Sequence, residues 1–259
     1  MSAALAGRAV LVTRPAGMST QLVALLRSEG GEAVLLPAIE ILPPDDTAKL
    51  DAAIDRLDGF DIAIFISPTA VATANAAVRA RRDWPARLRC AAVGSGTARA
   101  LREIGISDVL APQGRGDSDA LAALPELAAI TGARIVIFRG HGGREALRET
   151  LVARGAQVEY AECYRRARPR ADVGPLMERW GQGGIDAVCV TSAAGLENLL
   201  ALLGAAEVSG PALLRATPVF VPHPRVGEAA RNLGVERVIV TAAGDQALAE
   251  ALAAFFAKV

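Results

Sequence analysis

Residues 7–14 (GRAVLVTR) recur in pattern at residues 132–139 (GARIVIFR), 125 positions further along the chain. In both copies a glycine precedes a run of aliphatic residues, and an arginine stands where the run ends. Short runs of Val, Leu and Ile predict a buried strand, and each is followed by a helical pattern that closes on Gly30 or Gly155. The two copies therefore predict two strand–helix units of the same kind.

The repetition continues down the chain in the same order. Residues 60–67 (FDIAIFIS) match residues 185–192 (IDAVCVTS) at the same spacing of 125, and both end in serine. A third pair, residues 99–105 and 228–234, matches at a spacing of 129, so a small insertion separates it. Strand–loop–helix units resemble one another, but three matches in order indicate an internal duplication.

Apolar runs alternate with helical patterns along the whole chain, which is typical of parallel sheets with crossover helices. Ten strands are expected, enough for two five-stranded sheets, and the fold class is α/β. Helices are expected at 19–29, 97–104, 144–154 and 227–233. The expected strands are 9–13, 33–36, 62–66, 90–93, 108–110, 134–138, 157–161, 187–190, 218–221 and 237–240.

A duplicated chain can form two domains in series, split near residue 131, or it can cross twice between them. Residues 36–44 (LPAIEILPP) and 161–169 (AECYRRARP) occupy equivalent places in the two repeats, and both look extended and too short for a helix. They predict two linkers running side by side.

Two crossings imply one discontinuous domain and one inserted domain. We expect residues 1–38 and 170–259 to form the first and residues 44–165 to form the second. The linkers are then near residues 39–43 and 165–169.

Composition limits the class of function. The 259 residues carry 28 basic and 28 acidic side chains, and this balance argues against a nucleic-acid binder. The three cysteines lie far apart in apolar runs, as reduced core residues of a cytoplasmic protein do. No export signal is recognisable, and no apolar run approaches the ~18 residues of a membrane span.

Ligands of open parallel sheets bind beyond the carboxyl ends of the strands, where loops and helix N-termini gather. The loops expected there are small, hydroxyl-rich or glycine-rich, so their backbone N–H groups can bind an anion. Arg14 and Arg139 are candidates for binding carboxylates, although local salt bridges are an equal alternative. Ser67 and Ser192 can act as helix caps as well as ligand contacts. The candidates are Arg14, Ser67, Thr69, Gly94, Thr97, Arg139, Gly140, Ser192 and Arg225.

Several familiar sites are missing from the sequence. The Gly94-x-Gly96 pair lacks the third glycine of a dinucleotide fingerprint, and the chain has no GK[ST] of a phosphate-binding loop. The two histidines, His141 and His223, have no thiol or carboxylate at metal-binding spacing. We therefore expect no metal and no nucleotide cofactor.

Motifs along essentially the whole chain resemble those of uroporphyrinogen-III synthases. Each motif is weak alone, because that family is divergent, but their order and spacing together are fairly specific. The matching segments are 10–15 (VLVTRP), 65–71 (FISPTAV), 92–98 (AVGSGTA), 139–144 (RGHGGR), 163–165 (CYR) and 190–192 (VTS).

The resemblance implies two flavodoxin-like domains with parallel sheets, joined by a two-stranded linker. It implies a cofactor-independent lyase, a monomer, that cyclises hydroxymethylbilane to uroporphyrinogen III with inversion of ring D, between the domains. Tyr164 matches the residue usually considered to assist departure of the substrate hydroxyl. A phenol is protonated at neutral pH and can donate that proton; the alternative is that Tyr164 only packs the linker, while Tyr160 is expected in the strand core.

One segment departs from the family pattern. Val226, in the loop 222–226 (PHPRV), stands where Thr97 stands in the first repeat, so Arg225 or His223 would have to replace its hydroxyl. Two other classes remain open: a two-domain sensor of small anions, which would need an export signal or a DNA-binding extension, and a nucleotide-linked enzyme, which would need a fingerprint.

Overall fold

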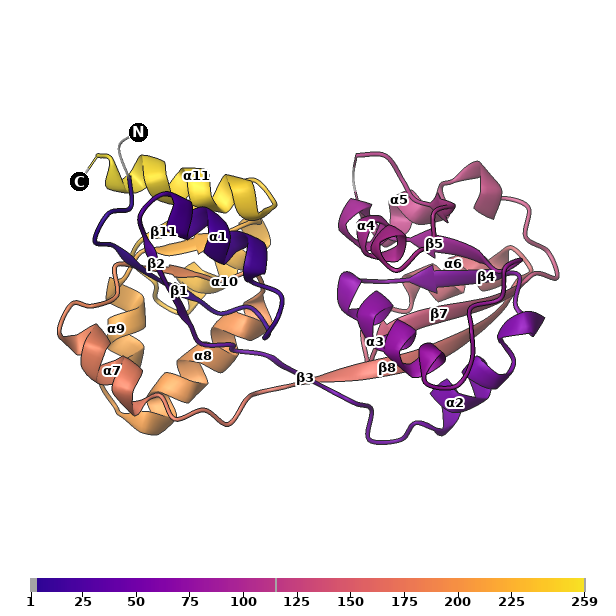
Figure 1. Cartoon of the computed structure of the whole chain (residues 1–259), viewed down its shortest axis with the longest axis horizontal. Helices are drawn as coiled ribbons and strands as arrows, with labels where there is room; N and C mark the ends of the chain where they lie inside the picture. The colour runs from indigo at the N-terminus through magenta and orange to yellow at the C-terminus, as the bar shows by residue number, and fades with distance from the viewer. Residues whose placement is uncertain (1–3, 115, 259) are drawn as a thin grey trace. The chain divides into compact units, whose positions relative to one another are not determined.

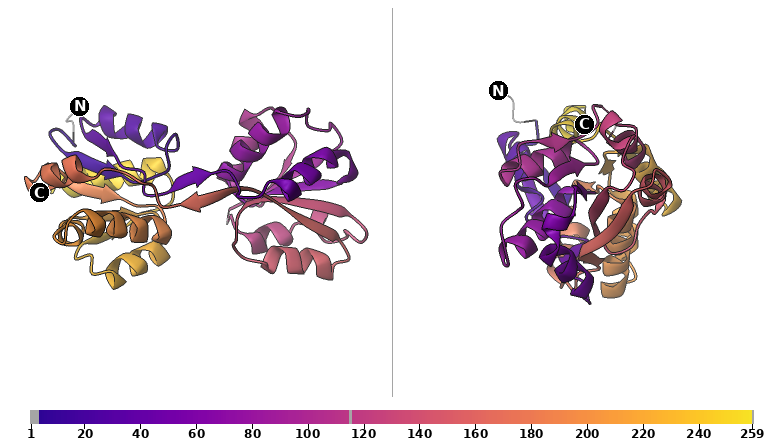
Figure 2. Two further views of the ribbon diagram at one scale, coloured as in Figure 1. Left: turned by 90° about the horizontal axis from the view of Figure 1, so that it is seen from below. Right: turned by 90° about the vertical axis from the view of Figure 1, so that its right-hand side faces the viewer.

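The computed structural model describes residues 4–114 and 116–258, and the chain divides into two compact units. Unit 1 consists of the chain up to Glu40 and from Ala167 onward, and unit 2 is Ile41–Arg166. Each unit is a sheet of mainly parallel strands covered by helices (Figures 1 and 2).

Unit 1 has a five-stranded sheet in the order β11-β10-β9-β1-β2, in which every pair is parallel. Counted along the chain within this unit, the order is 2-1-3-4-5, that of flavodoxin-like sheets. The strands are β1 (Ala9–Val12), β2 (Glu32–Leu35), β9 (Ala187–Cys189), β10 (Val219–Val221) and β11 (Val238–Val240). The helices are α1 (Thr20–Ser28), α7 (Gly174–Gly181), α8 (Ala193–Ala206), α9 (Gly210–Ala216), α10 (Pro224–Asn232) and α11 (Asp245–Phe256).

Unit 2 has a six-stranded sheet in the order β3-β8-β7-β4-β5-β6. The strands are β3 (Glu40–Leu42), β4 (Ile62–Phe65), β5 (Arg89–Ala92), β6 (Val109–Leu110), β7 (Arg134–Gly140) and β8 (Gln157–Ala167). The helices are α2 (Ala48–Asp55), α3 (Pro68–Arg79), α4 (Ser95–Glu103), α5 (Ser118–Ala122) and α6 (Ala146–Ala153), with 3₁₀ turns at Leu57–Gly59 and Pro125–Leu127.

The centre of each sheet joins strands from both repeats. In unit 1, Val10 of β1 pairs with Ala187 of β9, and in unit 2, Ile62 of β4 pairs with Ile135 of β7. The first two strands of one repeat therefore complete the last three strands of the other.

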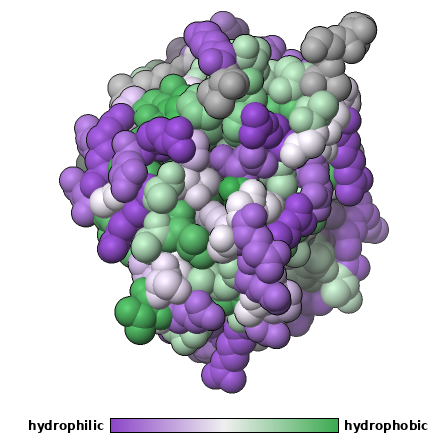
Figure 3. All heavy atoms as spheres, turned by 90° about the vertical axis from the view of Figure 1, so that its left-hand side faces the viewer, coloured by the Kyte–Doolittle hydropathy of each residue, from purple (hydrophilic) through white to green (hydrophobic). Residues whose placement is uncertain are grey.

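Alternating side chains of the strands divide each core into two layers. In unit 1, Val10 and Val12 pack under α1 and α11, while Ala9 and Leu11 pack under the helices α7 to α10. Unit 2 follows the same rule, with α2, α3 and α4 on one face and α5 and α6 on the other. On the face of the molecule in Figure 3, polar side chains separate small apolar areas.

All ten expected strands occur, but the expectation of two five-stranded sheets is wrong for unit 2. Its sixth strand, β3, lies in the segment expected as a linker and is hydrogen-bonded to β8, which itself continues to Ala167. Extended backbone beside a sheet edge gains hydrogen bonds by joining it, because its N–H and C=O groups are otherwise left to solvent. The cysteines Cys90, Cys163 and Cys189 are free and buried, as expected.

Candidate active site

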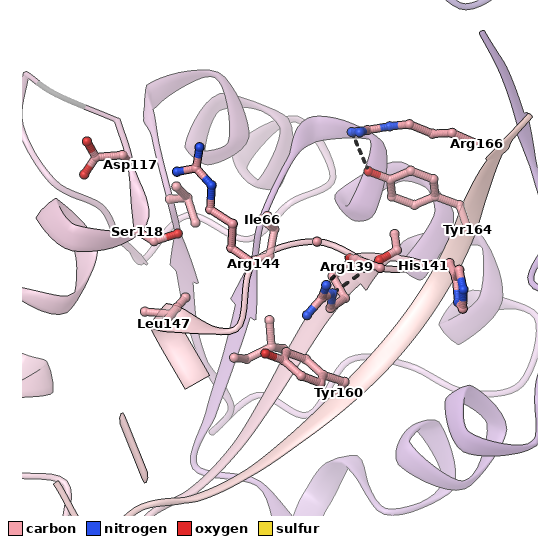
Figure 4. Close-up of a pocket in the computed structure, with 15 residues that line it drawn as sticks. Ile66, Asp117, Ser118, Arg139, His141, Arg144, Leu147, Tyr160, Tyr164 and Arg166 are labelled. Carbon is pink, nitrogen blue, oxygen red and sulfur yellow. Dashed lines mark hydrogen bonds between the residues drawn. The ribbon is translucent and has the colours of Figure 1, made fainter. Parts of the chain in front are cut away.

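A pocket of about 360 Å³ lies in unit 2, at the carboxyl ends of β4, β7 and β8 (Figure 4). This is the edge where strand order reverses and where ligands of such sheets bind. The labelled residues on its wall are Ile66, Asp117, Ser118, Arg139, His141, Arg144, Leu147, Tyr160, Tyr164 and Arg166.

An irregularity in β8 places Tyr164 at this pocket. Arg139 of β7 is paired with Glu162, but the next residue, Gly140, is paired with Tyr164, so Cys163 is an extra residue in the ladder. Such a bulge re-aims the side chains that follow it. Tyr164 consequently packs with Ala161 and Cys163, on the face opposite to Tyr160.

The ring of Tyr164 is buried, with 3% of the residue exposed. Its hydroxyl lies 3.2 Å from Ser67 Oγ and accepts a hydrogen bond of 3.3 Å from the guanidinium of Arg166. The ring also explains the glycine opposite it, since a Cβ on Gly140 would lie 2.7 Å from Tyr164 Cε2 and Cζ. Tyr164, Ser67 and Gly140 thus form one contact group.

Ser67 has two partners. As the residue before α3, it accepts the N–H of Ala70 at 3.1 Å, which satisfies a free donor of the first helical turn. Its duplicate, Ser192, caps α8 in the same way by accepting the N–H of Gly195 at 3.1 Å. The capping alternative therefore holds for both serines, and Ser67 contacts Tyr164 in addition.

Arg139 is tied into the loop that follows β7. Only 5% of the residue is exposed, and its guanidinium donates to Glu145 at 3.0 Å and to the carbonyl oxygens of Gly140 and Gly142. It also lies over the ring of Tyr160, 4.3 Å from the centroid. The salt-bridge alternative thus describes Arg139 in this structure, and its contacts fix the glycine-rich loop.

Tyr160 also contributes to holding the loop that follows β7. Its hydroxyl donates to Glu145 at 2.9 Å, and this hydrogen bond, together with those from Arg139, lowers the pKa of the Glu145 carboxyl. Burial and the same hydrogen bond raise the pKa of Tyr160. The expectation that Tyr160 is only strand core is incomplete, because the residue also lines the pocket.

Glu162 holds the same loop from the other side. One carboxylate oxygen lies 2.9 Å from His141 Nδ1, and the other accepts the N–H of Gly142 at 3.2 Å. The backbone N–H of His141 donates to the carbonyl of Tyr164 at 2.7 Å. The loop from Gly140 to Gly143 is therefore fixed by side chains of β7 and β8.

Two exposed arginines line the pocket in addition to buried Arg139. Figure 4 shows Arg144 rising from the loop toward Ser118, and Arg166 on the opposite side above Tyr164. Exposed guanidinium groups can bind carboxylates in bidentate fashion. Neither arginine is among the candidates expected from the sequence, although Arg166, two residues after Tyr164 on a strand, could have been selected by strand periodicity.

The remaining candidates of unit 2 start two helices. Thr69 is in the first turn of α3, and Thr97, which is 5% exposed, is in the first turn of α4. Gly94 precedes α4 at a close backbone contact, where an added Cβ would lie 3.2 Å from Gly116 Cα. Gly94 itself does not line the pocket, but the preceding residue, Val93, does.

The candidates of unit 1 occupy equivalent positions in that unit. Arg14 follows β1 and forms an ion pair with Asp245 at the start of α11, where both side chains are largely buried. Arg225 is exposed in the first turn of α10, and its N–H is accepted by His223 Nδ1 at 3.1 Å. Val226 is the third residue of α10, as Thr97 is of α4, so the structure confirms that these positions correspond.

Residues 4–114 and 116–258 lack two features that would indicate other functions. They contain no group of three or more His, Cys, Asp or Glu side chains placed to hold a metal ion. They also contain no helix that is long and apolar enough to cross a membrane.

Comparisons with known proteins agree on one family. The model of the family described as "Uroporphyrinogen-III synthase HemD" matches residues 20–250. The uroporphyrinogen-III synthase of Salmonella typhimurium is 39% identical over 194 residues, which cover 74% of this chain and 79% of that protein. The one from Escherichia coli is 35% identical over 245 residues, covering 94% and 99%.

Solved structures show the same fold. A mutant uroporphyrinogen III synthase from Thermus thermophilus matches with a TM-score of 0.62 at 18% identity, over 97% of this chain and 100% of that one. A uroporphyrinogen-III synthetase from Helicobacter pylori matches with a TM-score of 0.59 at 12% identity, over 96% and 99%. At these identities the likeness concerns the architecture alone.

Proposed function

The chain belongs to the uroporphyrinogen-III synthase family, and from this premise we infer which of its residues carry out the reaction. As a member, it is a hydro-lyase that converts hydroxymethylbilane to uroporphyrinogen III in tetrapyrrole biosynthesis. The two other classes considered, an anion sensor and a nucleotide-linked enzyme, are set aside by this membership.

The reaction sets two requirements. The substrate is a linear tetrapyrrole that must lose its hydroxyl as water to give an electrophilic azafulvene. A substituted carbon of the last pyrrole then attacks, and the spiro intermediate rearranges so that ring D is inverted. The enzyme must assist departure of the hydroxyl, and it must hold a flexible, carboxylate-rich chain in the geometry of ring closure, which can contribute ~7–11 kcal/mol.

We assign the first task to Tyr164. Its hydroxyl is presented at the pocket wall by a buried ring, and it is bonded to Ser67 and Arg166. A proton donor must be fixed within hydrogen-bond reach of the leaving oxygen, and a buried ring on a bulged strand provides that fixed position. This placement of Tyr164 is the observation that carries the assignment.

The second task falls to groups that bind carboxylates. We propose that Arg144 and the N–H groups at the helix starts near Ser67, Thr69, Gly94 and Thr97 bind acetate and propionate groups of the substrate. Exposed guanidinium groups and the N–H groups at the start of a helix both favour anions.

The candidates of unit 1 and the buried arginines are assigned by the same criterion. We propose that Ser192 and Arg225 bind substrate from unit 1. Arg14 and Arg139 act indirectly, because their guanidinium groups are already paired with Asp245 and Glu145 and shape the loops around them. Gly140 acts by leaving room for the ring of Tyr164.

The test is the substitution Tyr164→Phe, assayed with freshly generated hydroxymethylbilane and separation of the product isomers. Removing the proton while keeping the ring should lower kcat by about 10²-fold, within the range of positioned acids. Isomer III should still form faster than spontaneous closure, which yields the uninverted isomer. Tyr160→Phe, which removes the other phenol of the pocket, should cost less. Wild-type turnover by Tyr164→Phe would reduce Tyr164 to a packing residue.

We also propose that the enzyme acts as a monomer in the cytoplasm. Three free, buried thiols fit a reducing compartment, and the face in Figure 3 presents only small apolar areas between polar ones. Sedimentation velocity at micromolar concentration should give a single species near the chain mass of 26.8 kDa. A concentration-dependent shift to twice that mass would refute the proposal.

A further inference from the structure

Arg166 and Tyr164 project from the same strand, two residues apart, so strand periodicity brings their side chains together. One guanidinium nitrogen of Arg166 donates to the phenolic oxygen at 3.3 Å, and the guanidinium carbon lies 5.8 Å from the centre of the ring. The cation is thus beside the oxygen of Tyr164 while the rest of the guanidinium is exposed at the pocket.

Ser67 approaches the same oxygen from another element. Its Oγ already accepts the N–H of Ala70 and lies 3.2 Å from the oxygen of Tyr164, where either hydroxyl can be the donor. A phenolic oxygen can accept hydrogen bonds and still donate its single proton. Because Arg166 donates to that oxygen and Tyr164 lines the pocket, the phenol proton can be given either to Ser67 or to a substrate group bound in the pocket.

We propose that Arg166 is a positioning residue for the reaction, which directs the Tyr164 proton toward the substrate hydroxyl and stabilises the phenolate left behind. The inference rests on the proposed acid role of Tyr164. A positive charge beside the oxygen favours the ionised product of the transfer, which is the state that exists after the hydroxyl has left.

Every proton and bond in the proposed step is accounted for. The O–H bond of Tyr164 breaks as its proton joins the substrate hydroxyl, the carbon–oxygen bond of that hydroxymethyl group breaks, and water leaves. The azafulvene cation and the phenolate are the products. After ring closure and rearrangement, the pyrrole loses one proton to regain its aromaticity, and the phenolate can take up a proton again.

Kinetic constants distinguish a positioning role of Arg166 from direct binding of the substrate. If its guanidinium only bound a substrate carboxylate, replacing it would raise KM and would act independently of Tyr164. If it acts through Tyr164, its loss lowers kcat, and the effect disappears once the phenol is gone.

The experiment is a double-mutant cycle on the full chain, with kcat and KM measured for Arg166→Gln, Tyr164→Phe and the double variant. We expect Arg166→Gln to lower kcat about tenfold, the size of one charge-assisted hydrogen bond, with KM within about twofold of wild type. In the Tyr164→Phe background the same substitution should change kcat by less than about twofold. Arg166→Lys, which keeps the charge, should recover part of the loss, and Arg168→Gln, in the exposed segment after β8, should behave as wild type.

The outcomes separate the two proposals. Wild-type turnover by Tyr164→Phe would refute the acid assignment and, with it, the role of Arg166. A slow Tyr164→Phe combined with an Arg166→Gln effect that is equal in both backgrounds, or that falls on KM, would leave the acid in place and overturn the positioning role. A circular dichroism spectrum and melting temperature like those of wild type would show that the Arg166 variants are folded.

Discussion

At the scale of single residues, replacing Gly140 would test whether the position of the Tyr164 ring governs turnover. A Cβ at this position would lie 2.7 Å from two ring atoms of Tyr164, so Gly140→Ala must displace the phenol or the strand. Such overpacking costs about 1–3 kcal/mol of stability, and we expect kcat to fall at least about tenfold although no substrate contact is removed. Isomer-III production and urea unfolding measure the two effects.

Gly181→Ala is the matched control, since its added Cβ would meet no described atom outside its own helix and chain neighbours within 4 Å, and its backbone is helical. It should keep wild-type kcat and stability. If Gly140→Ala also retains wild-type kcat, then the position of the Tyr164 ring does not govern turnover.

The contacts of Tyr164 and Arg139 could not be predicted from the sequence, because they depend on irregular backbone. Strict alternation along β8 places Tyr160, Glu162 and Tyr164 on one face, and only the extra residue Cys163 moves Tyr164 to the other. The partner of Arg139 was equally hidden, because the turn that returns Glu145 to it is built by glycines at positive φ, Gly142 and Gly143. Sequence indicated that Arg139 and Tyr164 were important, but it could not tell which groups they face.

At the scale of secondary structure, the duplicated helix caps make a natural pair of experiments. Ser67 and Ser192 accept from the third residue of their helices at the same distance of 3.1 Å, so replacing either with alanine should cost about 1 kcal/mol of stability. Only Ser67 also contacts Tyr164. We therefore expect Ser67→Ala to lower kcat, whereas Ser192→Ala should change KM at most.

Denaturant unfolding and steady-state kinetics on both variants check this prediction. Equal losses of stability with unequal losses of kcat are expected. An equal fall of kcat in both variants would mean that the contact between Ser67 and Tyr164 has no part in turnover.

Helices and strands could be predicted from the sequence where the periodicity of apolar side chains alone determines the secondary structure. The ten expected strands carry short apolar runs, which are fully buried in central strands such as β1, β4 and β9, and all ten are present. The eleventh, β3, was expected only as part of the two-stranded linker that the family resemblance implies, because Pro37, Pro43 and Pro44 surround it and make the segment look like a linker. Its three residues form a strand because they can pair with the edge of β8, and this pairing depends on the tertiary structure and not on the local sequence.

At the scale of the whole chain, the interleaved repeats could be inferred from sequence because offsets of 125 and 129 recur in order. The two extended linkers also led us to group residues 1–38 with 170–259 and to expect residues 44–165 as a separate domain, but the sequence does not tell which strands are neighbours in each sheet. The structure shows that β1 pairs with β9 and β4 with β7, so each central pair joins one strand from before residue 131 to one strand from after it.

This topology predicts how the chain can be divided. A fragment of residues 1–131 keeps β1 without β9 and β4 without β7, so each of its two partial sheets exposes a central, wholly apolar strand edge, and we expect it to aggregate or remain unfolded. A fragment of residues 38–169 keeps all six strands of unit 2 and should unfold cooperatively on its own, as measured by circular dichroism against urea. Mixing residues 1–131 with 132–259 should restore structure that neither half has alone, because each supplies the strands the other lacks. Cooperative unfolding of the isolated 1–131 fragment would mean that the repeat itself, and not the unit composed of two half-repeats, is what folds.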